Sequence, residues 1–240
     1  MYWDYYLMGI ILLPAIIFAC IAQAKVSSTY KKYSKVNSEN GLTARQVAEL
    51  MLQKNGIHNV EVRRVKGQLT DYYSDKDKVV ALSEGVYDSS SVSAIGVAMH
   101  EVGHALQYAD GYTPIKFRNL MVKVCNLSSR LLWPLVILGL IFNLGVENGG
   151  VLGSIFLWAG IGFFSFSIIF NLITLPVEYN ASRRAKQLMK TEGILTDNEL
   201  SQASEVLNSA ALTYVASLVV SMLDLVRFLI VIFGSSKNRD

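Results

Sequence analysis

Apolar residues gather along this chain in four long runs. They cover residues 7–24, 131–146, 151–176 and 211–233. A helix needs roughly 20 apolar residues to cross the hydrocarbon core of a bilayer, so runs of this length predict transmembrane helices rather than core strands. The last run is interrupted by Asp224 and Arg227, so it either spans the membrane or lies partly in the interface, and we favour a span.

The second and third runs are joined only by the four residues Glu-Asn-Gly-Gly at 147–150. A polar turn this short between two spans predicts a helical hairpin, which returns the chain to the side that it left. Lysine and arginine follow the first run, precede the second and follow the third, but the turn has none. The positive-inside rule therefore predicts a multi-pass cell-membrane protein with its amino terminus outside and residues 25–130 and 177–210 in the cytoplasm.

The polar stretch after the first run has the signals of a small α+β region. Residues 42–56 predict a helix that begins with a capping box of Thr43 and Gln46 and ends at Gly56. Residues 58–65 and 77–83 predict strands separated by a polar break. Serines at 89–91 offer a cap for a further helix that begins near Val92.

The expected fold class is a mainly α membrane protein, a helical transmembrane bundle with a small cytoplasmic α+β part. We predict five segments: an anchor at 1–24, a cytoplasmic region at 25–125, a transmembrane hairpin at 126–176, cytoplasmic helices at 177–210, and a transmembrane or interfacial helix with a tail at 211–240.

Composition agrees with a membrane protein. Of the 240 residues 52% are hydrophobic and 17% are charged, whereas soluble domains carry about 25% charged residues. The net charge of +3 is explained by basic residues beside the spans, where anionic lipid attracts them, and no nucleic-acid recognition motif accompanies it. Cys20 and Cys125 lack a CxxC spacing, which argues against a disulfide framework and a cysteine zinc site.

Two of the three histidines lie in the pentapeptide His-Glu-Val-Gly-His, residues 100–104, inside the last predicted soluble helix. A spacing of four places His100 and His104 on one helical face, from which both can bind one zinc ion. Glu101 then lies beside the open position of the metal as a general base for a bound water. Gly103 lets another backbone approach this face. His58, the third histidine, is expected in a solvated loop.

The third ligand has two candidates. Asp110 follows His104 by six residues, but Asp110-Gly111 is more simply a turn that ends the helix. Glu178 follows the third run, and the hairpin returns it to the side of the histidines. Pro176 suits the start of a new helix with Glu178 in its first turn, where a solvated glutamate near the helix dipole is the alternative. The glutamates in the polar stretch that follows, Glu192, Glu199 and Glu205, are expected to be solvated.

The segments VSAIGVAMHEVGHALQ (92–107) and LPVEYNASRRA (175–185) resemble the YugP-like family of bacterial neutral zinc metallopeptidases, as does the segment 69–94. The chain is also distantly similar to the HtpX and CAAX prenyl protease class, whose glutamate in E-x-x-A-D is a zinc ligand. The resemblance implies that Glu178 is the third ligand. Ser182 replaces the aspartate of that pattern, and Tyr72 stands where members of the nearer family often have histidine.

We therefore expect a membrane-embedded zinc metalloendopeptidase with a zincin-like centre. One catalytic Zn²⁺ is held by His100, His104 and Glu178, and Glu101 is the general base. The expected partners are a peptide or membrane-protein substrate and the lipid bilayer, and the sequence indicates no oligomeric state. By resemblance to glutamate-zincins, the strand KVVALS (78–83) either binds an extended peptide along its edge or is purely structural.

Three questions stay open in the sequence. The group that stabilises the oxyanion has four candidates, Tyr108, Tyr179, Arg183 and Arg184. A membrane scaffold with a closed structural zinc site, in which Asp110 and Glu178 both bind, is the main alternative function. Asp224 and Arg227 mark either a polar transport path or an ion pair that lets the last helix enter the bilayer.

Overall fold

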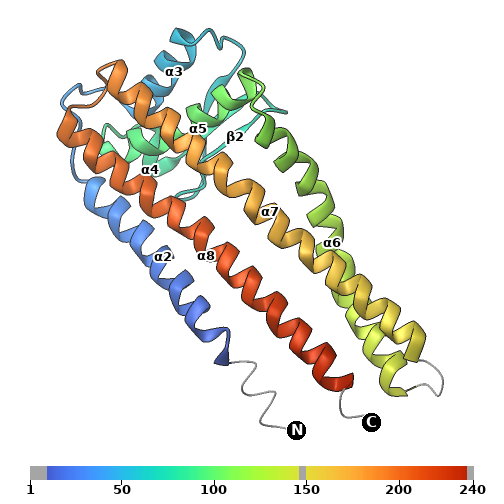
Figure 1. The fold of residues 1–240 in the computed structure, drawn as a ribbon. Helices are drawn as coiled ribbons and strands as arrows, with labels where there is room; N and C mark the ends of the chain where they lie inside the picture. Colours follow the sequence, from blue (N-terminus) through green and yellow to red (C-terminus); the bar gives the residue numbers. More distant parts are fainter. Residues whose placement is uncertain (1–9, 146–149, 237–240) are drawn as a thin grey trace. The chain divides into compact units, whose positions relative to one another are not determined.

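The computed structural model describes residues 10–145 and 150–236 and is mainly helical, with one small sheet (Figure 1). The mainly α fold class is confirmed at this level.

The described residues fall into two compact units. The helical unit comprises the described residues within 10–20, 116–145, 150–174 and 214–236, and the mixed unit comprises residues 21–115 and 175–213. The elements in chain order are α2 (Leu13–Tyr33), α3 (Ala44–Lys54), β1 (Glu61–Val65), β2 (Tyr72–Ser74), β3 (Val79–Ser83), α4 (Glu84–Tyr87), α5 (Val92–Ala109), α6 (Thr113–Gly145), α7 (Gly150–Thr191) and α8 (Asp197–Ser236).

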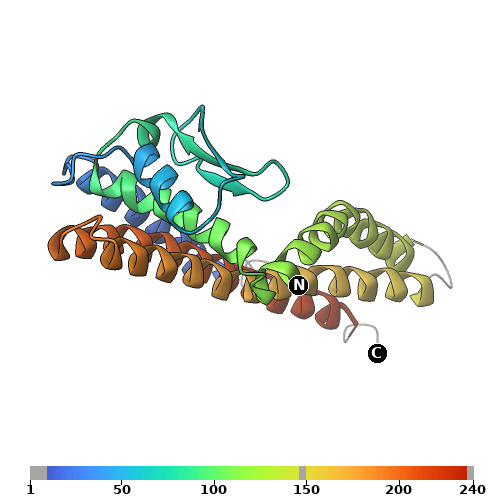
Figure 2. The ribbon, with the colours of Figure 1, turned by 90° about the horizontal axis from the view of Figure 1, so that it is seen from above.

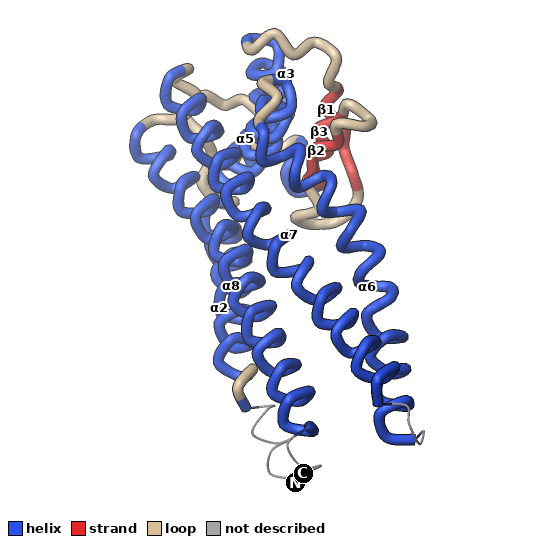
Figure 3. Tube along the Cα trace, turned by 45° about the vertical axis from the view of Figure 1, so that its right-hand side comes forward, coloured by secondary structure: helices blue, strands red, loops and turns tan. Residues whose placement is uncertain are grey.

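The sheet of the mixed unit has the order β1-β3-β2, with β1 parallel and β2 antiparallel to β3 (Figure 3). All five residues of β3 are buried. The two predicted strands are present with shorter bounds, and β2 lies in the segment that the sequence indicated as a polar break. Because β3 is paired on both sides, the hypothesis that residues 78–83 offer a free edge to a peptide is wrong. The edge on this side of the sheet belongs to β2.

Local signals set the helix ends of the mixed unit as predicted. Thr43 caps α3 through a capping box with Gln46. Ser91 caps α5 by accepting a hydrogen bond from the backbone of Ala94. Helix α5 ends at Asp110, and Gly111 follows with a positive φ of 63°, so the predicted turn is confirmed.

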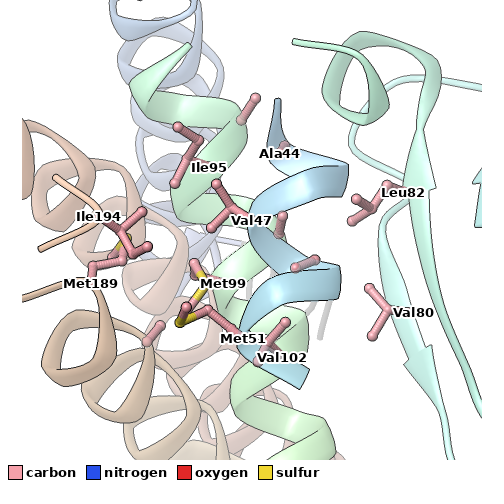
Figure 4. Packing of buried hydrophobic residues seen from close by; sticks show 14 of the residues in the cluster. Ala44, Val47, Met51, Val80, Leu82, Ile95, Met99, Val102, Met189 and Ile194 are labelled. Atoms are coloured by element: carbon pink, nitrogen blue, oxygen red, sulfur yellow. The ribbon is translucent and has the colours of Figure 1, made fainter. Parts of the chain in front are cut away.

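The core of the mixed unit fixes α5 in place. Val47 and Met51 on α3 lie beside Met99 on α5, and all three are fully buried (Figure 4). Met189 near the end of α7 belongs to the same cluster, with Ile194 in the loop before α8. A fully buried side chain of this size contributes about 1.5–3 kcal/mol, so this cluster holds α5 firmly against its neighbours.

The predicted helix start at Pro176 is wrong, because α7 is one helix from Gly150 to Thr191 with Pro176 inside it. Proline lacks the N–H that would bond to the residue four positions earlier, which breaks many helices in water. Helices with membrane-spanning sequences tolerate it, because neighbouring groups and local adjustments satisfy the freed carbonyl. Glu178 therefore lies on the same helix as the third apolar run.

Two described helices, α7 and α8, are long and apolar enough to cross a membrane. Helix α6 meets the same criterion only if Thr113–Ser128 and Arg130–Gly139, bent by 40° from each other, are counted as one span. The first predicted span begins outside the described residues. Its described part carries exposed apolar residues along α2, such as Ile17 and Ile21, but α2 does not meet the criterion over the residues described. That span stays a prediction.

Within the helical unit, α6 and α7 lie side by side (Figures 1 and 2). A Cβ on Gly139 of α6 would lie only 2.8 Å from the side chain of Leu157 on α7, so the helices meet closely there. Most of the predicted turn between them lies outside the described residues. Asn171 on α7 donates a hydrogen bond of 2.9 Å to Ser221 on α8.

The predicted ion pair on the last helix is confirmed. Arg227 Nη1 lies 3.7 Å from Asp224 Oδ1, one turn away on α8. A paired charge costs less to bring near lipid than an isolated one. The alternative role of these residues in transport stays untested.

Asp71, just before β2, extends the contact between β2 and β3. Its carboxylate accepts hydrogen bonds from the backbone N–H of Ser83, at 2.7 Å, and from the Ser83 hydroxyl, at 3.0 Å. Burial raises the pKa of the Asp71 carboxyl above its ordinary value of 3.8, although the bonds from Ser83 act in the opposite direction. The charged carboxylate is therefore a net cost to the folded state.

This cost predicts the behaviour of Asp71→Asn. Between the ordinary pKa and the raised pKa the folded chain holds a proton that the unfolded chain releases, so stability falls as pH rises through that window. An amide can keep both contacts, with Oδ1 accepting from the Ser83 N–H and Nδ2 donating to the Ser83 hydroxyl oxygen, and it does not titrate. The variant should therefore melt at a higher temperature than the wild type at pH 7, and the difference should shrink near pH 4. A difference that is the same at both pH values contradicts the assignment.

Candidate metal centre

The centre is built where α5 and α7 approach each other with no side chain between them. A Cβ on Gly103 would lie 2.5 Å from the carbonyl oxygen of Ala181, a distance that real Cβ atoms do not reach. The predicted reason for this glycine, close approach of another backbone, is confirmed. Because α5 carries His100 and His104 on either side of Gly103, the contact also brings both imidazoles to α7.

One carboxylate oxygen of α7 faces both histidines of α5. Glu178 Oε2 lies 3.1 Å from His100 Nε2 and 3.4 Å from His104 Nε2. The ligand atoms of the three residues all lie within 4.8 Å of one another, and Glu178 is only 2% exposed. The structure thus brings together the two histidines and the glutamate that the sequence and the resemblance singled out.

The spacing of these atoms suits a zinc ion. Zinc bonds to histidine nitrogen and carboxylate oxygen are about 2.0–2.2 Å long, so neighbouring ligand atoms of a tetrahedral site lie about 3.3 Å apart. The two observed separations, 3.1 and 3.4 Å, fall on either side of that value. Two imidazoles and one carboxylate are also a ligand set that zinc enzymes use. The donor set and these two separations therefore suit a zinc site.

The outer nitrogen of each imidazole has its own partner. His100 Nδ1 lies 3.1 Å from the hydroxyl of Ser182, and His104 Nδ1 lies 3.0 Å from Oε1 of Gln107. Ser182 thus contacts His100 even though it replaces the aspartate of the E-x-x-A-D pattern. Gln107 is fully buried and also contacts Asn180 on α7. Neither amide could be recognised from the sequence, because an isolated glutamine or asparagine in a helix resembles any polar helical residue.

Glu101 follows His100 on α5 and is buried, with 7% of its surface exposed. Burial raises the pKa of its carboxyl, and the nearby charges of Glu178 and Asp71 add to the rise, while the two histidines oppose it. Burial alone would lower the pKa of His104, but its hydrogen bond and charge interaction with Glu178 raise it. The centre therefore combines two carboxyl groups and two imidazoles that influence one another strongly.

Asp110, the other candidate ligand, lies outside the cluster. Its carboxylate forms an ion pair with Arg184 of α7. The Arg184 guanidinium also donates to Asn180 at 2.9 Å. Among the described residues the group of potential ligands contains His100, His104 and Glu178 and does not include Asp110.

The other residues considered from the sequence lie apart from this group. His58 is exposed in a loop, as predicted, and Tyr72 is 48% exposed on β2. The expectation of a solvated residue is wrong for Glu199, which is 4% exposed because it accepts hydrogen bonds from the backbone of Glu39 and Thr196. Two further glutamates pair at the surface, Glu192 with Lys54 and Glu205 with Lys32.

The four candidate oxyanion donors differ in their surroundings. Tyr179 is 49% exposed and Arg183 is exposed, both on α7. Tyr108 on α5 packs against Tyr73 of β2, with ring centroids 5.4 Å apart. Arg184 is engaged by Asp110 and Asn180. The identity of the oxyanion donor stays a prediction.

Comparison with known proteins supports the resemblance. The family model described as "Putative neutral zinc metallopeptidase" matches residues 8–233. The chain is 45% identical over 219 residues to the "Putative membrane protease YugP" of Bacillus subtilis (strain 168), an alignment that covers 90% of this chain and 93% of that protein. No solved structure matches the chain.

The contact between α5 and α7 can be tested with two glycines of the same helix. Gly103→Ala places a methyl group against the Ala181 carbonyl and should destabilise the protein by about 1–3 kcal/mol, the usual cost of overpacking. It should also weaken zinc binding, because α7 must move away. Gly96→Ala is the matched control, since the nearest atom to its Cβ would be the Ala203 methyl at 3.4 Å, an ordinary van der Waals contact. Thermal melts and zinc titrations in detergent check both, and equal behaviour of the two variants contradicts the contact.

Proposed function

This chain belongs to the neutral zinc metallopeptidase family, and we propose that it is a membrane-embedded zinc endopeptidase. The observation that carries the proposal is the convergence of His100 Nε2, His104 Nε2 and Glu178 Oε2 beside a buried Glu101. Family membership supports zinc and peptidase activity in general. The roles of individual residues below are our assignment from geometry.

His100, His104 and Glu178 would hold one Zn²⁺, which when bound supplies a Lewis acid that polarises a peptide carbonyl and acidifies a water molecule. The three side chains come from rigid helices, so little rearrangement would be needed to bind the ion. Glu178 and the two imidazoles already have their Nε2 and Oε2 atoms turned inward. The protein's own contribution at this stage is a pre-formed ligand cage.

Glu101 is the proposed general base. It accepts a proton from the attacking water and donates it to the nitrogen of the leaving amine, which keeps the proton balance of peptide hydrolysis. The raised pKa that burial gives its carboxyl suits both halves of this task, because a base that must later act as an acid works best near the operating pH. A glutamate at this position has no role in a closed structural site.

The alternative of a structural zinc site is less well supported by the surroundings of the cluster. Structural zinc sites usually have four protein ligands, whereas catalytic sites have three and keep one position open. The candidate fourth ligand, Asp110, is engaged by Arg184, and the described residues bring only three ligands together. These contacts favour a catalytic site.

The position of the centre along the chain indicates where its substrate would lie relative to the membrane. Glu178 follows the apolar run of α7 by two residues on the same helix, a rise of about 3 Å. We therefore propose that the centre lies at the membrane surface, where it acts on peptides or on segments of membrane proteins close to the bilayer. Strand β2 lies at a sheet edge and its Tyr73 packs against Tyr108 of α5, so β2 replaces β3 as the strand along which an extended peptide would bind.

Glu101→Gln separates the base from the ligands. The amide has almost the same shape but cannot accept a proton, so peptide hydrolysis should fall by about 10²–10⁴-fold while zinc content stays that of the wild type. His104→Ala should lose both zinc and hydrolysis. The measurements are metal analysis and cleavage of an unstructured protein substrate by the purified full-length chain.

Glu84→Gln, on the exposed first turn of α4, is the control for these assays and should leave zinc content and hydrolysis unchanged. Hydrolysis that survives Glu101→Gln would end the proposed mechanism. A wild-type protein without zinc would end the proposed function.

The proposed cytoplasmic side of the centre can be tested by labelling cysteines. In a chain with Cys20 and Cys125 replaced by serine, Lys190→Cys at the exposed end of α7 should react with an impermeant maleimide only after the cells are opened. Asn148→Cys, in the predicted outer turn beyond the described residues, should react in intact cells. The reverse pattern would place the centre outside the cell.

A further inference from the structure

Gln107 lies one turn after His104 on α5, and the pentapeptide motif does not include it. Its side chain is fully buried, and both ends of its amide are engaged. Oε1 lies 3.0 Å from His104 Nδ1, while Nε2 donates to the carbonyl oxygen of Val177 at 2.8 Å and to Oδ1 of Asn180 at 3.0 Å. Two of these partners flank Glu178 on α7, so one side chain connects a candidate ligand helix to the other.

The orientation of this amide follows from its partners. The Val177 carbonyl can only accept a hydrogen bond, so the amide nitrogen must face it and the amide oxygen must face His104. An amide oxygen can only accept, so the hydrogen between the two side chains belongs to His104 Nδ1. In the neutral imidazole this leaves the lone pair on Nε2, the atom that faces Glu178.

The next residues in the network maintain the same orientation. Arg184 Nε donates to Asn180 Oδ1 at 2.9 Å, and a guanidinium has no acceptor, so the oxygen of Asn180 is fixed on the side of Gln107. Arg184 is held in turn by its ion pair with Asp110. The donor and the acceptor of each hydrogen bond are therefore determined along the whole network, from the Arg184–Asp110 ion pair through Asn180 and Gln107 to His104.

The outer nitrogen of His100 has no equivalent constraint among the described contacts. Its Nδ1 contacts the Ser182 hydroxyl, which can donate or accept, so that contact allows either tautomer. The two imidazoles thus differ: the network around Gln107 sets the protonated nitrogen of His104, and the contact with Ser182 leaves that of His100 free.

We propose that Gln107 is a positioning residue of the metal centre. It holds His104 in the Nδ1–H tautomer, with Nε2 directed at the candidate zinc position. The inference deepens the proposed function and rests on it. Loss of such a partner of a metal-bound histidine typically weakens metal affinity by about 10–100-fold.

Two substitutions separate orientation from simple packing. Gln107→Leu removes the acceptor and the donor, and should weaken zinc affinity by about 10–100-fold. Gln107→Glu, when ionised, keeps an acceptor for His104 Nδ1–H but cannot donate to the Val177 carbonyl, so it should recover most of the zinc affinity although its melting temperature falls. The matched control is Gln202→Leu on α8, which should bind zinc as the wild type does, because Gln202 lies outside the ligand cluster.

The experiment is a Zn²⁺ titration of the purified full-length protein in detergent against a chelator of known affinity, with a thermal melt of each variant. If Gln107→Leu is folded and binds zinc as tightly as the wild type, the proposal is overturned. It is also overturned if Gln107→Glu binds zinc no better than Gln107→Leu. Both variants lack the amide NH2 group, so equal affinities would mean that zinc binding does not depend on the acceptor for His104 Nδ1–H. A wild-type protein that binds no zinc would instead overturn the proposed function itself.

A second measurement needs no folded variant. The chain has three histidines, so long-range ¹H–¹⁵N spectra of the zinc-loaded wild type contain few enough signals to assign. His104 should show a protonated Nδ1 and a metal-bound Nε2. Metal bound through Nδ1, or a proton on Nε2, would overturn the proposal even if Gln107→Leu could not be purified.

Discussion

The centre depends on the place where α5 meets α7 at Gly103. The two candidate ligand histidines come from one helix and the glutamate from another, far along the chain, so their distances are set by how those helices pack. At Gly103 a backbone carbonyl occupies the space that any side chain would need. Such a contact lets α5 and α7 shift little along each other, because two helices whose backbones touch can pack in few other relative positions. The geometry of the ligands is thus a property of the helix pair.

The two imidazoles and Glu178 can be buried because their polar atoms contact one another and neighbouring polar groups. Such groups inside an apolar helix pair would be costly if they lacked a partner. The Nδ1 atoms turn outward to Ser182 and Gln107, and the Nε2 atoms turn inward to Glu178. Glu178 Oε2 lies about one tetrahedral edge from each Nε2. A metal ion could therefore enter the cluster while the surrounding hydrogen bonds stay as they are.

The sequence predicted features that local chemistry decides. The caps of α3 and α5, the turn at Asp110 and the histidine pair were all visible, because each depends on residues within one or two turns. Glu178 was reached by combining the expected hairpin with a family resemblance. Features that depend on distant partners were not visible. Helix α7 continues through Pro176, which in an aqueous helix would signal an end, and β2 is only three residues long.

Gln107 shows most clearly why part of the site could not be predicted. Glutamine is an ordinary helix former, and nothing in the residues around it marks the side chain as buried. Its role appears only when α7 supplies a carbonyl and an asparagine within hydrogen-bond distance. The motif indicates which residues can hold a metal. The tertiary contacts determine which of their atoms are available to bind it.

The chemistry of the proposed centre also follows from which partners carry charge. In the more distant protease class an aspartate stands where this chain has Ser182, and Gln107 beside His104 is likewise neutral. A carboxylate hydrogen-bonded to a ligand histidine makes that imidazole more basic and offsets part of the metal's charge. With a hydroxyl and an amide in those places, neither imidazole contacts a carboxylate at its outer nitrogen. The positive charge of a bound zinc is then less compensated, which strengthens its effect on a bound water and on a substrate carbonyl. Its charge would also favour the ionised form of the neighbouring Glu101, whereas burial raises the pKa of that carboxyl. Neutral partners around the histidines therefore favour the ionised form of the buried glutamate that the mechanism needs.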